Sequence, residues 1–513
     1  MKKTIYIVFL FMCIIQTNAQ FNPQSKKVTE QFFPDDESIQ NVTPALQKKK
    51  GFTNYEELIA FLNNLKAKHS DYVTITYIGE SQKGNQIPLL KISHPKVKES
   101  KVKVWIQGGL HGNEPASTEG ILYFLYTILN NKSYYYLLDK IELAVVPMAN
   151  IDGYEKQDRY AANGLDLNRD QTKLMAPESV ALKQAFSDFN PEVGLDFHEY
   201  NPYRKDFMKL GNYGVAASYD VMLLYSGNLN VPKNIRTLTD SLFIENTQQE
   251  LDHHKLTHHD YMSTDKFHGE IVFNQGSNNS RSSATSYALT NTIATLVEVR
   301  GVGLDRTSFK RRINTTFLIA MSYLKTAYEN APLIKQEIEK AQQLQNEIAV
   351  TSTRETYKNK IKVIDLDTDK LIDLEVTIRD ALQSKPKLTR KLPEAYLILE
   401  NQNELISKIK TLGIQVKILS EDTELEVESF LITSYESDGV PYEKMNLQKV
   451  ATQLITKKIL FPKGTYRITT HQKNYPLLTE VLEAEAPNSF ISFGVLKTEL
   501  NQELPIYRLP KKN

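Results

Sequence analysis

The sequence has one cysteine in 513 residues, Cys13, and it lies in an apolar run near the N-terminus that we expect to be removed. Without that residue the chain can form no disulfide and has no thiolate to act as nucleophile or metal ligand. Any catalysis must therefore use histidine, carboxylate or hydroxyl groups, or a metal ion.

Long apolar runs and an excess of charge of one sign are also missing. The longest apolar run, residues 5–15, is shorter than the about 20 residues that cross a bilayer. The net charge is +1, which gives no reason to expect nucleic acid or an anionic membrane as a partner. We find no long internal repeat and no low-complexity tract.

The first nineteen residues have the pattern of a secretory signal peptide. Lys2 and Lys3 precede the apolar run, and a small-residue exit ends at Ala19. The sequence therefore predicts cleavage after Ala19 and a soluble, secreted or periplasmic protein without stable membrane insertion. Removing 19 of 513 residues leaves 494, enough for two or three domains.

Helix and strand patterns alternate from about residue 50 to residue 331. A capped amphipathic helix at 53–69 precedes strand patterns, and further buried strands are expected at 141–148, 192–198 and 294–300. This alternation predicts an α/β fold with a mixed or parallel central sheet flanked by helices. The strands end at polar residues, which is where open α/β sheets place their sites.

The pattern changes after Ala331. A polar helix is followed by a basic, proline-marked connector at 385–393, then by a strand, a helix that stops at Gly413, and further strands. These features predict a smaller C-terminal α/β module. The expected organisation is a signal peptide (1–19), an N-terminal extension (20–49), a catalytic domain (50–331) and an accessory C-terminal module (332–513).

Three residues beside predicted strand ends have the chemistry of metal ligands. His111 and Glu114 stand in GGLHGNEP, between a strand and the helix that begins at Pro115, and His198 follows the apolar run VGLDF. A catalytic zinc needs three such ligands and one position open to water. A lone histidine at a strand end more often only caps the strand, so each residue alone identifies nothing.

Other polar residues are equally ambiguous when they are taken one at a time. Glu298 lies inside the apolar strand ATLVEVRG, where Arg300 is the obvious partner for its charge. Asp166, Asn168 and Arg169 in NGLDLNRD are typical turn and capping residues. Only the joint order of all these residues carries a specific signal.

Six motifs in this order resemble the zinc metallocarboxypeptidases of the carboxypeptidase A type. They are YEELIAFLNNL, YIGESQKGNQIPLLKIS, GGLHGNEP, GLDLNRD, LDFHEY and LVEVRG, and they span roughly residues 50–328. The resemblance implies a carboxypeptidase A-like mixed sheet and an exported zinc peptidase. More loosely, the remainder resembles the tail of long exported bacterial members of this family, including the closing YRL.

The resemblance also implies a metal centre with one zinc per chain. Matched position by position, His111, Glu114 and His198 hold the zinc, and Glu298 is the general base. Asp166 matches the acid that orients the first histidine ligand, a role that such ligands usually need filled.

Further matches concern the substrate. The resemblance implies that Arg159 polarises the scissile carbonyl and that Asn168 and Arg169 clamp the terminal carboxylate, for which a planar guanidinium is well suited. The family's mobile tyrosine, usually some twenty residues before the base, has no clear counterpart. Tyr287 and Tyr261 lie 11 (298 − 287) and 37 (298 − 261) residues before Glu298.

The stretch LDHHKLTHHDY contains four histidines with i, i+4 spacing, which can bind zinc on a helix. They are His253, His254, His258 and His259. No acidic HExxH pattern accompanies them, so we expect a solvated insertion face; a substrate-contacting rim or an adventitious metal site are the alternatives.

The sequence thus predicts an enzyme that removes C-terminal residues from peptides. One alternative keeps the same zinc and base but cleaves another amide, in peptidoglycan stem peptides or acylated amino acids. The other is an inactive binding domain, which the presence of His111, Glu114, His198 and Glu298 disfavours. The preferred side chain is not predicted, because the register of QGSNNSRSSATSY cannot be fixed.

Overall fold

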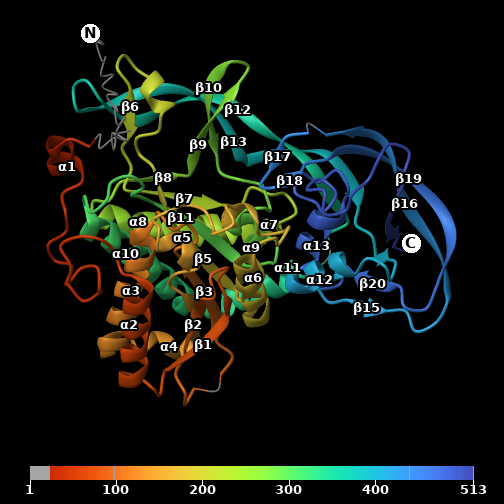
Figure 1. The fold of residues 1–513 in the computed structure, drawn as a ribbon, viewed down its shortest axis with the longest axis horizontal. Helices are drawn as coiled ribbons and strands as arrows, with labels where there is room; N and C mark the ends of the chain where they lie inside the picture. Colours follow the sequence, from red (N-terminus) through yellow and green to blue (C-terminus); the bar gives the residue numbers. More distant parts are fainter. Residues whose placement is uncertain (1–23, 98, 344, 438, 512–513) are drawn as a thin grey trace, which may run out of the picture.

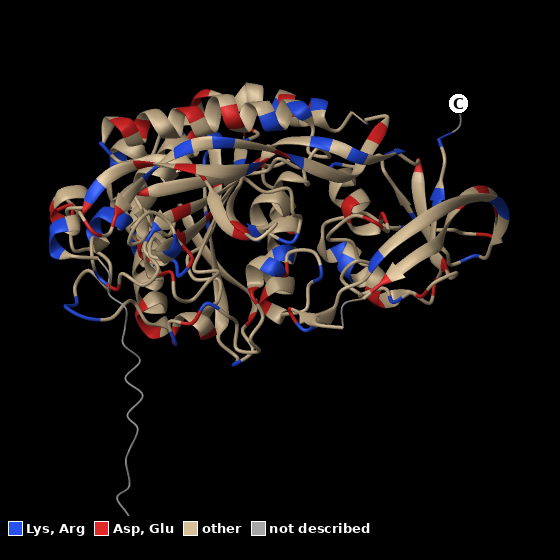
Figure 2. Cartoon of the chain, turned by 90° about the horizontal axis from the view of Figure 1, so that it is seen from above, with Lys and Arg blue, Asp and Glu red and all other residues tan. Residues whose placement is uncertain are grey.

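The computed structural model describes residues 24–511 except 98, 344 and 438. The predicted signal peptide, 1–19, lies outside the described residues. In the part of the chain that the structure describes, no helix combines the length and the apolar character needed to span a bilayer. Lysine and arginine alternate with acidic residues along the ribbon (Figure 2), in keeping with the near-neutral net charge.

An eight-stranded mixed sheet forms the centre of the predicted catalytic region, residues 50–331 (Figure 1). Its strands are β1 (Val73–Glu80), β2 (Gln86–Ile92), β3 (Val102–Gly108), β4 (Ile141–Val146), β5 (Val193–Tyr200), β7 (Val221–Tyr225), β8 (His258–Asp260) and β11 (Ile293–Arg300). The order is β1-β2-β4-β3-β5-β11-β7-β8. Strands β4, β3, β5 and β11 are parallel to one another, β2 is antiparallel to both of its neighbours, and β7 is antiparallel to β11 but parallel to β8. The predicted α/β class with a mixed central sheet is confirmed.

Helices cover this sheet because its inner strands are apolar on both faces. Every residue of β5 is buried, as expected for a parallel strand between helical layers. The helices that pack on the strands include α2 (Tyr55–Lys68), α3 (Pro115–Asn130), α6 (Pro177–Phe189), α9 (Ser283–Ala288) and α10 (Phe309–Glu329). The predicted helix at 53–69 is α2, which Asn54 and Glu57 close with a capping box.

A second, five-stranded sheet includes residues from both sides of position 332. It has the order β6-β12-β13-β10-β9. Its strands are β6 (Val215–Ala217), β9 (Met262–Phe267), β10 (Glu270–Gln275), β12 (Glu347–Asp365) and β13 (Lys370–Lys391). The long β12–β13 hairpin pairs with β6 on one side and β10 on the other, so it shares a sheet with the catalytic region. A boundary at residue 332 stays a prediction.

The expected connector at 385–393 is wrong over most of its length. Residues 385–391 form the last part of β13, and Pro386 faces Ser352 where the pairing register shifts. Strands tolerate proline at such irregularities because the ladder hydrogen bond is already missing there. The basic composition suggested a loop, whereas the pairing with β12 makes a strand.

The remaining C-terminal residues form a six-stranded sheet with the order β15-β20-β14-β21-β16-β19. Its elements are β14 (Ala395–Ile398), α12 (Asn403–Thr411), β15 (Lys417–Ile418), β16 (Thr423–Glu436), β19 (Lys449–Phe461), β20 (Tyr466–Thr469), α13 (Tyr475–Leu482) and β21 (Glu503–Leu509). The predicted strand, helix and strand before and after Gly413 are confirmed. Tyr396 and Leu477 belong to the same buried apolar cluster as Leu195 in β5, so this region packs on the catalytic region.

Candidate active site and metal centre

The three predicted metal ligands lie in the loop after β3 and in the neighbouring strand β5. His111 and Glu114 lie in the loop after β3, and Glu114 is the N-cap of α3, while His198 lies in β5. The loop lies close to the backbone of residues 153–158. A Cβ atom added to Gly112 would be only 2.0 Å from the carbonyl carbon of Gly153. Only glycine permits this close approach between the ligand-bearing loop and the backbone of residues 153–158.

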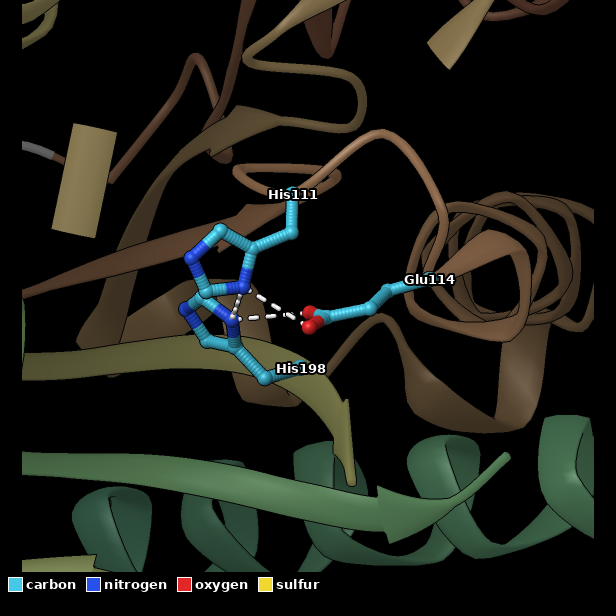
Figure 3. Close-up of side chains that lie close together, drawn as sticks. All are labelled: His111, Glu114 and His198. Carbon is cyan, nitrogen blue, oxygen red and sulfur yellow. Dashed lines mark hydrogen bonds and ion pairs between the residues drawn. The ribbon is translucent and has the colours of Figure 1, made fainter. Parts of the chain in front are cut away.

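The three side chains point toward one another (Figure 3). Nδ1 of His111 lies 2.7 Å from one Glu114 oxygen, Nδ1 of His198 lies 2.8 Å from the other, and the two nitrogens are 3.0 Å apart. All three residues are buried. In the described part of the chain, no other group of three or more histidine, cysteine or acidic residues converges in this way.

Second carboxylates fix which imidazole nitrogens face the centre. Nε2 of His111 donates to Asp166 at 3.0 Å, and Nε2 of His198 donates to Asp196 at 2.9 Å. With its proton on Nε2, each imidazole presents the Nδ1 lone pair to the other imidazole and to Glu114. Three electron-rich groups this close repel one another unless a positive charge lies among them.

The pKa values of His198 and Glu114 also indicate that the site attracts positive charge. Burial lowers the pKa of His198, but the carboxylates of Asp196 and Glu114 outweigh it and hold the pKa well above its usual range. Burial raises the pKa of Glu114, but His111 and His198 bring it well below its usual range. The donor set thus attracts positive charge, and two imidazoles with one carboxylate are a ligand set that suits zinc.

Glu298 lies beside this centre without joining it. It is the register partner of His198 in the parallel β5–β11 pair, so the two side chains occupy neighbouring positions on the sheet. Burial and the nearby Glu114 raise the pKa of Glu298 to about 7. Arg300, the alternative partner, instead donates to the Ala217 carbonyl.

The adjacent Glu199 is a poor candidate for the same task. Its carboxylate forms a buried ion pair with Arg312 at 2.6 Å and accepts the Ala116 N–H at 2.9 Å. Both contacts occupy the oxygens that a proton acceptor would need free. Of the two acids, Glu298 is therefore the one available at the cavity.

Arg159 connects the metal centre to the cavity wall. Its Nε and Nη2 donate to one Asp166 oxygen at 3.0 and 2.8 Å, and its Nη1 lies 3.6 Å from Glu114. Asp166 thus binds both His111 and Arg159. The guanidinium is held next to the ligands with part of its surface facing the cavity.

Asn168 and Arg169 lie on the same cavity wall. The Asn168 side-chain oxygen accepts the Ser283 N–H at 2.8 Å, which leaves its amide nitrogen as a donor. Arg169 donates to the Asn168 carbonyl at 2.8 Å. Asp170, the next residue, is buried against Lys173 at 3.0 Å, so its charge is neutralised away from Arg169.

The cavity that these residues enclose has a volume of about 700 Å³. His111, Arg159, Asn168, Arg169 and Glu298 all line it. Glu114, His198 and Asp166 lie behind this lining and position it. The structure therefore gathers all eight predicted residues around one cavity.

Two residues of this site were not assigned from the sequence. Tyr261 lines the cavity near Glu298, whereas Tyr287 is buried, stacked on Phe186. The β9–β10 hairpin, residues 262–275, lies between Tyr261 and Glu298 and accounts for 14 of the residues that separate them. Asp196 was missed, although its place two residues before His198 on a strand puts both side chains on one face.

The histidine-rich stretch forms no second metal centre among the described residues. His253 ends a helix, while His258 and His259 begin β8, so the i, i+4 spacing does not lie on one helix. His254 faces Glu250 at 3.6 Å, and His258 faces Asp252 at 3.1 Å. The stretch is thus partly exposed, and two of its histidines have local carboxylate neighbours.

Comparison with known proteins gives matches across the chain. A family model described as zinc carboxypeptidase matches residues 58–331, more than half of the sequence. Carboxypeptidase 2 of Trichophyton rubrum is 28% identical over 476 residues, which cover 90% of this chain and 87% of that protein. Probable carboxypeptidase 2 of Arthroderma benhamiae is 26% identical, covering 84% of each chain. Among solved structures, carboxypeptidase A from Helicoverpa armigera is 19% identical with a TM-score of 0.43, covering 57% of this chain and 79% of that one.

Proposed function

Since this chain belongs to the zinc carboxypeptidase family, we propose that it hydrolyses the last peptide bond of its substrates with His111, Glu114 and His198 as zinc ligands. Membership makes the chain a zinc-dependent metallopeptidase that cleaves C-terminal residues. We further propose that Glu298 is the general base, that Arg159, Asn168 and Arg169 bind the substrate, and that the protein is exported.

One observation carries the ligand assignment. The lone pairs of two imidazole nitrogens and a carboxylate converge within 3.0 Å of one another, and Asp166 and Asp196 hold the opposite nitrogens in the required tautomer. Zinc in this position supplies a Lewis acid that lowers the pKa of water toward neutrality and polarises a carbonyl.

Glu298 acts as the general base in this mechanism. Its raised pKa, about 7, is suited to taking a proton from the attacking water and passing it to the leaving amine near neutral pH. Its place next to His198 in the sheet supports this role. Arg159, held by Asp166, stabilises the negative charge that develops on the carbonyl oxygen.

Asn168 and Arg169 select the end of the substrate. The free amide nitrogen of Asn168 and the remaining guanidinium donors of Arg169 match the planar carboxylate of a C-terminus. Tyr261 supplies a further donor, because burial and Glu298 raise its pKa to about 12 and keep its hydroxyl protonated. Binding the terminal carboxylate places the preceding amide at the reactive groups and restricts cleavage to one residue.

The protein acts outside the cytoplasm. The basic start, the apolar run and the small-residue exit at Ala19 support export and removal of the first nineteen residues. Sequencing the N-terminus of the protein from culture supernatant or periplasm tests this part of the proposal. A mature chain that begins at Gln20 is expected.

A pair of peptides that differ only at the C-terminus tests the exopeptidase function. The zinc-loaded protein should release one residue from the free acid, as detected by mass spectrometry, and cleave the C-terminal amide at least about 10-fold more slowly. This factor corresponds to losing one charge-assisted hydrogen bond. His198→Ala serves as the control and should lose both zinc and activity. Equal rates on the two peptides would contradict the carboxylate clamp, and cleavage only of muropeptides would show a different amide substrate.

A further inference from the structure

The cavity wall carries an unusual excess of unpaired positive charge. Seven lysine and arginine residues line the cavity: Arg159, Arg169, Arg204, Arg281, Arg354, Lys362 and Arg379. Three of them are neutralised by carboxylates, Arg159 by Asp166, Arg204 by Asp206 and Lys362 by Asp373. Among the residues that the structure describes, the other four have no carboxylate within ion-pairing distance.

Acidic residues on the wall do not compensate these four arginines. Glu199 is already paired with Arg312, and Glu298 has the role of general base. Asp265 lies on β9 near Arg354 but beyond ion-pairing distance. In the proposed function Arg169 binds the substrate terminus. That leaves Arg281, Arg354 and Arg379, which have only more distant carboxylates and no ion pair among the described residues.

Arg281 belongs to a segment that is hydrogen-bonded to the proposed carboxylate clamp. Its carbonyl accepts the Gln171 N–H at 3.3 Å, and two residues later Ser283 donates to Asn168 at 2.8 Å. The segment 281–283 is thus fastened to the loop that carries Asn168 and Arg169. A substrate held by Arg169 would bring the side chain of its last residue into this part of the cavity.

The C-terminal region holds Arg281 in place. Its guanidinium lies over the ring of Tyr442 at 5.1 Å, and its backbone N–H donates to Asn488 at 3.3 Å. Glu443, next to Tyr442, accepts the Asp166 N–H at 2.8 Å. Residues more than 100 positions beyond residue 331 therefore contact Arg281 and Asp166 at the site.

The other two arginines come from the β12–β13 hairpin. Arg354 on β12 donates to Asn274 at 2.9 Å, and Arg379 on β13 lies over the Phe267 ring at 4.2 Å. Burial lowers the pKa of Arg281 and of Arg354. Arg169 lowers the pKa of Arg281 further, against the opposing effects of Tyr442 and more distant carboxylates, and Arg379 lowers that of Arg354. A bound anion would relieve this repulsion, because a partly buried cation without a partner is costly.

From this arrangement we infer that the enzyme prefers substrates whose C-terminal residue is glutamate or aspartate, with Arg281 as the partner of the side-chain carboxylate. Such a residue has two carboxylates, and the cavity offers Arg169 for one and Arg281 for the other. Arg354 and Arg379 add positive potential on the adjacent wall. The inference rests on the proposed function, since Arg169 must first hold the terminal carboxylate.

Peptides that differ only in their last residue test this preference. For the zinc-loaded protein, kcat/KM should be at least about 10-fold higher for a terminal glutamate than for the isosteric glutamine. Arg281→Gln should bring this ratio close to one while the glutamine peptide is still cleaved, and Arg281→Lys should keep part of the preference. Lys358→Gln, which removes an exposed charge outside the cavity from the β12–β13 hairpin that carries Arg354 and Arg379, should leave the ratio unchanged.

Other outcomes would contradict the preference for an acidic residue, the role of Arg281 or the exopeptidase function. If the wild-type protein releases glutamate and glutamine equally well, the preference is wrong but the proposed function stands. If Arg281→Gln slows both peptides by the same factor, Arg281 binds the terminal carboxylate rather than the side chain. If no peptide in the set loses its last residue, the proposed function fails and the preference fails with it.

Discussion

Glu480 offers a quantitative test of how the C-terminal region packs on the catalytic region. It is buried in α13 and accepts hydrogen bonds from Asn228 at 3.3 Å and from Asn230 at 3.5 Å. These long contacts stabilise the carboxylate only weakly. Burial therefore dominates and raises the pKa of Glu480 from 4.5 to about 7.

The size and the direction of the effect follow from linkage. The folded protein binds the Glu480 proton more tightly than the unfolded chain, so this residue makes the free energy of unfolding fall as the pH rises from about 4.5 to about 7. A pKa difference of about 2.5, at about 1.4 kcal/mol per pKa unit, amounts to about 3 kcal/mol above pH 7. Glu480→Gln removes this loss, because glutamine keeps the shape of the protonated side chain and does not titrate.

Urea unfolding between pH 4 and pH 8 provides the assay. Glu480→Gln should match the wild type near pH 4, below the unfolded pKa, and be up to about 3 kcal/mol more stable at pH 8. Glu499→Gln removes an exposed carboxylate from the same region and should leave the pH dependence unchanged. A Glu480→Gln variant that loses stability with rising pH as steeply as the wild type would refute the reasoning.

Two further predictions concern the groups around the metal centre. Asp196→Asn removes the carboxylate that holds Nε2 of His198, so zinc affinity measured by chelator competition should fall about 10- to 100-fold; unchanged affinity would mean that Asp196 does not orient the ligand. Arg159→Gln should lower kcat about 10²- to 10³-fold with a much smaller change in KM, because it removes charge stabilisation that the transition state needs most; an effect confined to KM would assign Arg159 to substrate binding instead.

The core of the site could be predicted because its residues lie at the ends of strands. His198 and Glu298 each occupy a polar position in an otherwise apolar strand, and the parallel register of β5 and β11 makes them neighbours. The alternation of strands and helices predicted a mixed or parallel sheet but not which strands pair or in which register. The order of the motifs then gave the roles, which spacing alone left open.

Features that depend on pairing between distant segments were missed. Tyr261 was not assigned because the β9–β10 hairpin lies between it and Glu298, so the spacing of the two residues was not the expected one. Residues 385–391 were expected to form a connector but belong to β13. Arg354 lines the cavity, and Tyr442 packs against the cavity residue Arg281, although both come from segments without any catalytic pattern. No local sequence signal marks such residues, because long-range strand pairing and packing bring them to the site.

The central claim is that one zinc centre and a separate glutamate base perform the hydrolysis. Parallel measurement of zinc content and peptide hydrolysis for Glu298→Gln tests it most directly, since Glu298 lies beside the three ligands without belonging to them. The account predicts a folded protein with about one zinc per chain and a kcat reduced about 10²- to 10⁴-fold, with little change in substrate affinity. A variant that stays fully active, or one that loses its zinc, would contradict the account.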